Sequence, residues 1–409
     1  QTCALPIYTE RLRILNDKTL SKTNRMHWSR LWGINRESVL NNVEEFDFLR
    51  CIPYDPFHIF LEGELDYVTG IFLHRCIYVC EYFSLDWINK QIEQFQYSYI
   101  DSKDKPAKLN KNDINKYSCK QTAASMLTLS YVLPHIIYWK VPENDRHYRN
   151  FIKFLQLTSL CICPMMDKDS IGEVDIRVST FYNEFKQLYP LGSIHPKAHQ
   201  CAHLTYYISE FGPPRNFWNM RFEAKHAFFK NVKWRNYINL PKSLSEKHQR
   251  YMANKMVGDD GNMNLNFLYL GDEISKGNRV NIIEMYPHIV SPEVTRQIGD
   301  DNVYECISIK TNGKTYKAGV GILVKNNDWP EFGVVEAIWC NSKNEIFLVL
   351  EESDTVEFMW KLNAFQIMQS GTYDVINVSR LKNPFPLPIF KHCKNLYVSN
   401  RYSNLQCQF

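Results

Sequence analysis

The sequence predicts an α+β protein in which a long helical region precedes a smaller β-rich region. From about residue 46 to 250, apolar residues recur at helical spacing, whereas beyond about residue 302 they form short runs separated by turn residues. The chain has 409 residues, of which 44% are apolar and 22% charged. This composition predicts two or three packed domains and excludes intrinsic disorder.

In the helical region, Ser84 and Ser179 each precede apolar residues at helical spacing, so both are predicted N-caps. Residues 101–120 between these helices are lysine-rich and lack periodicity. They are therefore predicted to form an exposed loop.

The β-rich region begins near residue 301 and predicts a small sheet or barrel that serves as a structural or interaction module. Residues 256–300 contain five glycines and little periodicity, so they predict a loose linker. The runs that predict strands are YECISIK, GVGILVK, FGVVEAIWC, EIFLVLE and YDVINVS.

Two long apolar stretches, residues 67–83 and 127–139, are interrupted by charged or proline residues, so no membrane span is predicted. The twelve cysteines include no C-x-x-C pair. This usage is typical of reduced, packed thiols and predicts an intracellular protein.

The first seven residues, QTCALPI, resemble the translation of a sequencing adapter, CAG ACG TGT GCT CTT CCG ATC T. Residues 1–7 are therefore expected to be an artefactual N-terminus and are excluded from the fold prediction. The native chain is expected to continue upstream of residue 8.

Two pairs of side chains have metal-ligand chemistry. Asp55 and His58 are three residues apart, and His199 and His203 are four apart, a spacing that places both imidazoles on one helix face. Each pair also has an ordinary interpretation: Asp before Pro is a common helix start, and a histidine pair at this spacing is common on surfaces and in satisfied cores.

The segment Arg215–Arg250 contains nine Lys or Arg residues and two acids, although the whole chain has a net charge of only +4. Aromatic residues are interleaved with these cations, a pattern that predicts contact with a nucleic-acid backbone. The alternative is a solvated helix that covers a core. The predicted DNA-binding residues are Arg215, Arg221, Lys225, Lys230, Lys233 and Arg235.

Several segments, in order and with similar spacing, resemble the animal En/Spm-type (CACTA-like) transposases. They include IPYDPFHIFLEG, VPENDRHYRNFIKFLQL, FKQLYPLGSIHPKAHQCAHL and FGPPRNFWNMRFEAKHAFFKN. The resemblance covers about residues 35 to 250, whereas residues 251–409 resemble the tails of those proteins only in general character.

The resemblance implies a ribonuclease H-like core interrupted by a large helical insertion, with two Asp and one Glu that bind two Mg²⁺ or Mn²⁺ ions. Glu223, in RFEAKH, is similar to the last acid of that triad. The implied organisation is a partial catalytic core with an Asp-x-x-His signature (8–64), a helical insertion (65–195), core helices with the catalytic Glu and the basic stretch (196–255), a linker (256–300) and a small β domain (301–409).

A related layout occurs in the V(D)J recombinase and its Transib relatives, in which two ligand pairs flanking the insertion share one zinc ion. By this resemblance, Asp55, His58, His199 and His203 are expected to hold a structural Zn²⁺. The departure is Asp in place of Cys, which weakens the preference for zinc because thiolate is the softer ligand.

In the family, both catalytic Asp residues precede the matched region. The chain is therefore expected to be a catalytically incomplete fragment of a cut-and-paste DNA transposase, located in the nucleus, with DNA and a possible second copy of the chain as its partners. The alternative is a domesticated or decayed copy that acts as a zinc-stabilised DNA-binding protein without catalysis.

Overall fold

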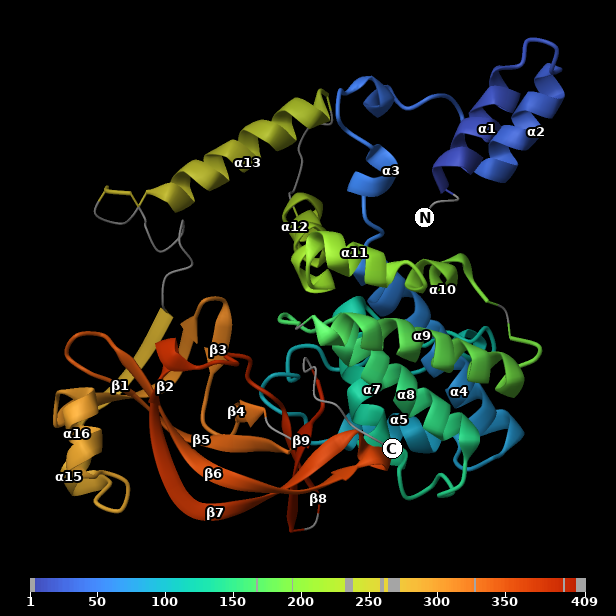
Figure 1. Ribbon diagram of the computed structural model, residues 1–409. Helices are drawn as coiled ribbons and strands as arrows, with labels where there is room; N and C mark the ends of the chain where they lie inside the picture. Colours follow the sequence, from blue (N-terminus) through green and yellow to red (C-terminus); the bar gives the residue numbers. More distant parts are fainter. Residues whose placement is uncertain are drawn as a thin grey trace.

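The computed structural model describes residues 4–166, 168–192, 194–231, 238–257, 261–263, 273–326, 329–392 and 394–401. A helical half and a curled antiparallel sheet pack side by side, while α1, α2 and α13 project from the helical half (Figure 1). The predicted α+β class and barrel-like sheet are confirmed.

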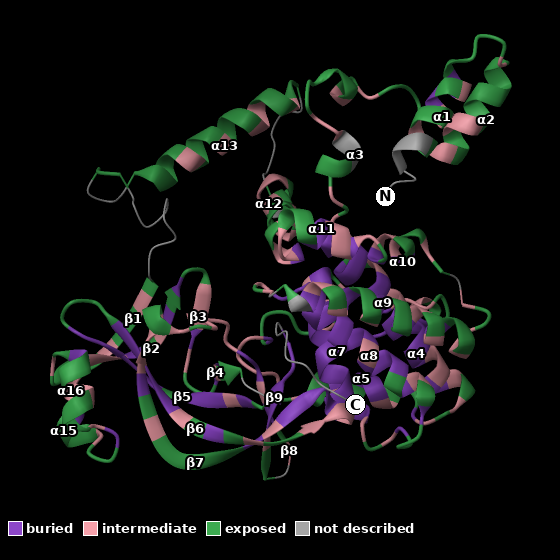
Figure 2. Cartoon of the chain, viewed as in Figure 1, coloured by how far each residue is buried: buried purple, intermediate pink, exposed green. Residues whose placement is uncertain are grey.

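The helical half is built around α7 and α8, which are almost entirely buried (Figure 2). Its elements are α1 (Ala4–Asn16), α2 (Lys22–Trp32), η1 (Val39–Asn42), α3 (Phe48–Cys51), η2 (Phe57–Glu64), α4 (Leu65–His74), η3 (Arg75–Val79), α5 (Leu85–Gln94), α6 (Lys111–Ile114), α7 (Ala123–Ile137), α8 (Arg146–Cys161), α9 (Asp169–Leu188), α10 (Pro196–Cys201), α11 (Leu204–Phe211), η4 (Pro214–Asn216), α12 (Met220–Lys230) and α13 (Leu240–Met256).

One of the two predicted N-caps is confirmed. The Ser84 hydroxyl accepts a hydrogen bond from the backbone N–H of Trp87 at the start of α5. The other prediction was wrong, because α9 starts about ten residues before Ser179. Val174 and Val178 extend the buried face upstream, so the exposed Ser179 lies inside the helix.

The prediction that residues 101–120 form a solvated loop was also wrong in part. Asp101, Leu109, Ile114 and Cys119 are all buried. The backbone N–H and carbonyl of Leu109 both bond to the Asn89 side chain, which fastens this segment to α5. A few apolar anchors therefore hold a polar segment against the core.

The sheet is antiparallel throughout, in the order β1-β2-β5-β6-β7-β9-β8, with β3 paired to β2 and β4 paired to β5. All five predicted runs contribute to strands. The strands are β1 (Glu273–Asn281), β2 (Asn302–Thr311), β3 (Lys314–Tyr316), β4 (Gly321–Asn326), β5 (Pro330–Cys340), β6 (Ile346–Met359), β7 (Ala364–Asn377), β8 (Ile389–His392) and β9 (Asn395–Ser399); η5 (Trp360–Leu362) and η6 (Val378–Arg380) connect them.

The predicted linker 256–300 contains part of this β unit. β1 pairs with β2, and α15 (Ile282–Met285) and α16 (Pro292–Ile298) cover one face of the sheet through Ile282 and Ile298. Strand β1 is mostly polar because it lies at the sheet edge, so it lacks the alternation that would have predicted it. The β unit thus begins by residue 273 rather than at 301.

The two halves share buried polar contacts. The Arg401 guanidinium lies 2.5 Å from the Asp101 carboxylate, and both side chains are 2% exposed. His135 and His392 rings stack, with Nδ1 and Nε2 2.9 Å apart. Phe390 of β8 belongs to the core of the helical half. The β unit is therefore continuous with the helical half rather than an independently packed appendage.

The described parts of residues 8–64 and 196–255 contribute helices and no strand, so they do not include a ribonuclease H-like sheet. Helix α1 runs across the boundary expected at residue 7. Among the described helices, none combines the length and apolar character that crossing a membrane requires.

Candidate functional site

The Asp-x-x-His signature forms the entrance to η2, a π-helix. The Asp55 carboxylate accepts a hydrogen bond from the backbone N–H of Phe57 at 3.0 Å, which forms an Asx turn leading into η2. Phe57, Phe60 and Leu61 are buried, and His58 remains partly exposed on the other face. Such wide turns recur at functional sites because they redirect individual side chains.

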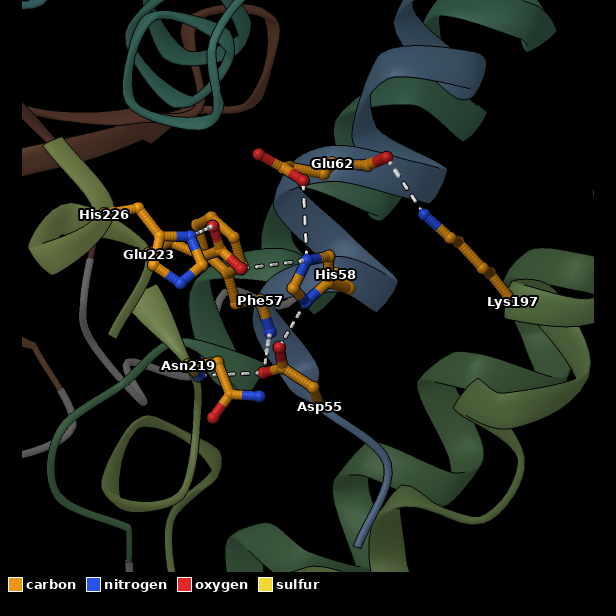
Figure 3. Close-up of polar contacts among 8 residues, drawn as sticks. All are labelled: Asp55, Phe57, His58, Glu62, Lys197, Asn219, Glu223 and His226. Atoms are coloured by element: carbon orange, nitrogen blue, oxygen red, sulfur yellow. Dashed lines mark hydrogen bonds and ion pairs between the residues drawn. The ribbon is translucent and has the colours of Figure 1, made fainter. Parts of the chain in front are cut away.

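Asp55 also joins this entrance to the start of α12, far away in the sequence. Its Oδ1 accepts a hydrogen bond from the Asn219 backbone N–H at 3.0 Å, and its Oδ2 is hydrogen bonded to Nδ1 of His58 (Figure 3). The carboxylate thus fixes the orientation of the imidazole and leaves Nε2 facing the centre of the site.

Glu223 lies at that centre, on the first turn of α12. Its Oε1 is 3.9 Å from Nε2 of His58 and its Oε2 is 3.1 Å from Nδ1 of His226. Glu62 approaches the same His58 nitrogen to 3.6 Å (Figure 3). The structure therefore brings together Asp55, His58 and Glu223, which the sequence proposed separately.

Three neighbours of this group were not predicted. His226 follows Glu223 by three residues on one helix, a spacing that could have indicated it. Asn219 contributes only its backbone N–H, which every residue except proline has, so its residue type could not have predicted the contact. Lys197 closes the other side by donating from Nζ to the Glu62 carbonyl at 3.0 Å.

The two predicted histidine ligands face one another. His199 lies in the last turn of α10 and His203 is the N-cap of α11, so the pair spans two short helices rather than one, and the Nε2 atoms are 3.2 Å apart. Two nitrogens bound tetrahedrally at about 2.0–2.1 Å from one zinc ion would lie roughly 3.4 Å apart. Burial and the charge of His199 lower the pKa of His203, which favours the neutral form that binds metal.

The four predicted zinc ligands do not converge as their side chains stand. Asp55 is engaged by Phe57, Asn219 and His58, and the open nitrogen of His58 faces Glu62 and Glu223. Across the part of the chain that the structure describes, no three His, Cys, Asp or Glu side chains are arranged to hold an ion. The geometry fits a two-imidazole half-site and does not fit the complete four-ligand set.

A cavity of about 690 Å³ adjoins the site and is lined by residues of both η2 and α10, among them His58 and Lys197. Glu64 lines it but is only 2% exposed, and its Oε2 accepts a hydrogen bond from the Tyr182 hydroxyl at 2.9 Å. Burial raises the pKa of Glu64 to about 7, although the Tyr182 hydrogen bond and the Lys197 charge oppose this shift.

The predicted DNA-binding residues lie on η4 and α12. Arg221 and Lys230 are exposed, whereas Arg215 and Lys225 are partly buried. Lys233 and Arg235 fall outside the described residues. Helix α13 continues this surface: Tyr251 packs on α12 through Phe228, and no described side chain of α13 is buried (Figure 2).

Comparisons of the chain with protein-family models, with curated proteins and with solved structures find no match.

Proposed function

We propose that this chain is the later part of the catalytic core of a cut-and-paste DNA transposase of the En/Spm type, acting on DNA in the nucleus. The observation that carries the proposal is the contact between Glu223 and the Asp55–His58 pair. These residues are more than 160 positions apart, and the resemblance assigns Glu223 to the catalytic triad and the Asp55–His58 pair to a metal-binding signature of the same core.

Glu223 suits the role of a metal-binding acid. Its carboxylate is 40% exposed, and within the described residues its partners closer than 4 Å are the imidazoles of His58 and His226. Because no described Lys or Arg neutralises it at that range, the carboxylate remains available to a cation. Bound Mg²⁺ or Mn²⁺ would activate water for strand cleavage and stabilise the leaving oxygen.

The chain's own residues prepare the site. Asp55 holds His58 in one orientation, and its bond to the Asn219 N–H sets where α12 begins. The position of Glu223 relative to η2 therefore depends on Asp55. The ribonuclease H-like sheet and its two Asp residues belong to this proposal through the resemblance alone.

DNA binding is the first test. Duplex affinity should fall steeply with salt, because every phosphate contact releases counterions. Reversing Arg221, Lys225 and Lys230 to Glu should reduce the slope of log affinity against log salt by about 3, at roughly 0.9 per contact. Lack of duplex binding by the wild-type chain would refute the proposal.

Catalysis is the second test, in the parent transposase that supplies both Asp residues. Glu223→Gln should abolish Mg²⁺-dependent cleavage and leave duplex affinity unchanged, because it removes the metal-binding charge with little change in size. Glu62→Gln is the matched control, because Glu62 is the other acid near Nε2 of His58, and it should retain cleavage. Full activity of Glu223→Gln would exclude Glu223 from the triad.

The histidine pair favours a second candidate, a zinc-stabilised DNA-binding protein without catalysis. Addition of Zn²⁺ should raise the melting temperature of the wild-type chain and have no effect on His203→Ala, because a ligand that binds only the folded state stabilises it. Asp55→Asn distinguishes a four-ligand zinc site from a site made by the histidine pair alone. If zinc no longer stabilises this variant, Asp55 is a ligand; if zinc still does, the histidine pair binds it alone.

A further inference from the structure

The β2–β3 hairpin approaches the basic segment of the helical half. A Cβ added to Gly313, in the hairpin turn, would lie 3.9 Å from the Arg221 guanidinium. Asn312 and Gly313 both adopt positive φ, the backbone of a tight two-residue hairpin turn that holds Lys314 at the start of β3. The turn is thus a rigid part of the β unit beside α12.

Phe385 connects the two halves at this point. Its ring centroid lies 4.7 Å from Lys314 Nζ and 5.4 Å from the Arg215 guanidinium carbon. Arg215 lies 5.2 Å from the Trp218 ring as well, so it is held between one aromatic ring from each half. Cations take such positions because the face of an aromatic ring is electronegative.

Two hydrogen bonds hold the loop that carries Phe385 in place. The Tyr316 hydroxyl donates a hydrogen bond to the Pro384 carbonyl, and the Phe385 backbone N–H donates to the Asn383 side chain. Because Tyr316 is fully buried in β3, Phe385 and Lys314 are anchored to the same strand. The fold therefore holds the backbone of Phe385 close to that of β3.

Two like charges at one ring repel each other unless an anion lies between them. Partial burial, and then the charge of Arg215, lower the pKa of Lys314. In the described residues, no carboxylate lies within 4 Å of Lys314 Nζ, whereas nearby Lys310 is paired with Glu273. Lys314 therefore has a neighbouring cation and no described carboxylate at ion-pair range.

We propose that Lys314 and Arg215 together bind a backbone phosphate of duplex DNA, so that the β unit extends the DNA-binding surface of α12. This inference rests on the proposed function and goes beyond it, because it gives the β unit a direct role in holding DNA. A phosphate fits because it is a compact anion with several acceptor oxygens that can bond to both cations.

The experiment measures duplex affinity of the full chain from about 50 to 200 mM salt. Lys314→Glu should bind duplex more weakly than the wild type. Because one phosphate contact contributes about 0.9 to the salt slope, the ratio of wild-type to variant affinity should fall about 3.5-fold between the lowest and highest salt concentrations. Lys343→Glu makes the same charge change in the turn beyond β5, at the opposite end of β2, and should leave the slope unaltered.

A double-variant cycle tests whether the two cations share one phosphate. Arg215→Gln and Lys314→Gln should together cost less affinity than the sum of the single losses, because either loss alone disrupts the shared contact. Equal melting temperatures establish that the variants are folded.

The outcomes separate the two proposals. Salt-dependent duplex binding with equal slopes for Lys314→Glu and Lys343→Glu overturns the phosphate site and leaves the proposed function intact. Absence of duplex binding in the wild type refutes both.

Discussion

Replacing Glu64 with Gln tests the electrostatics beneath the candidate site. The carboxyl is 2% exposed, and in the described structure its Oε1 has no hydrogen-bond partner. Burial raises the pKa of Glu64 from 4.5 to about 7. Between these pH values the folded chain keeps a proton that the unfolded chain has lost, so folding stability falls as pH rises through the interval.

The magnitude follows from the difference between the two pKa values. Each unit corresponds to about 1.4 kcal/mol, so the charged carboxylate of Glu64 costs roughly 3 kcal/mol above about pH 8 and little at about pH 4.5. A glutamine side chain at this position does not titrate, and its amide oxygen can still accept the Tyr182 hydrogen bond. The gain in unfolding free energy from Glu64→Gln should therefore be about 3 kcal/mol larger at about pH 8.5 than at about pH 4.5.

Urea unfolding followed by circular dichroism at both pH values measures this difference. Glu62→Gln is the matched control, because its side chain is 45% exposed and only two positions away. A Glu64→Gln effect that is the same at both pH values would refute the reasoning, because a change of packing alone is independent of pH.

Two further predictions concern the contact between the halves. Arg401→Met should lower the free energy of unfolding by about 3–5 kcal/mol, because it leaves the Asp101 carboxylate buried without its cation; adding Asp101→Asn should recover part of the loss, and equal single and double variants would contradict this account. Burial lowers the pKa of His135 well below its ordinary value, so its contribution to stability is present above about pH 6.5 and is lost as pH falls. The stability of His135→Asn should depend less steeply on pH between about 7 and 5, and parallel wild-type and variant curves would oppose this assignment.

The sequence predicted the elements whose signals are local. Ser84 caps α5 as expected, and the alternating runs form strands as expected. The prediction failed where the decisive partner is distant. Asp101 looked solvated because its cation is 300 residues away, and β1 looked like a linker because its pairing with β2 carries no apolar pattern.

The candidate site shows the same division. Asp55, His58 and Glu223 were selected by motif and resemblance, and the structure brings them together. The Asn219 contact uses only a backbone N–H, and the cation pair of Arg215 and Lys314 crosses between halves, so neither leaves a pattern along the chain. Such contacts are properties of the packed fold.

The Asp101–Arg401 pair also has a consequence for the order of events during synthesis. The 300 residues between these partners take about 15 to 60 s to translate at roughly 5–20 residues per second. Throughout that interval Asp101 has emerged from the ribosome and its cation has not. The carboxylate must stay hydrated or protonated until Arg401 is available, so this part of the helical half can reach its final packing only after residue 401 has been made.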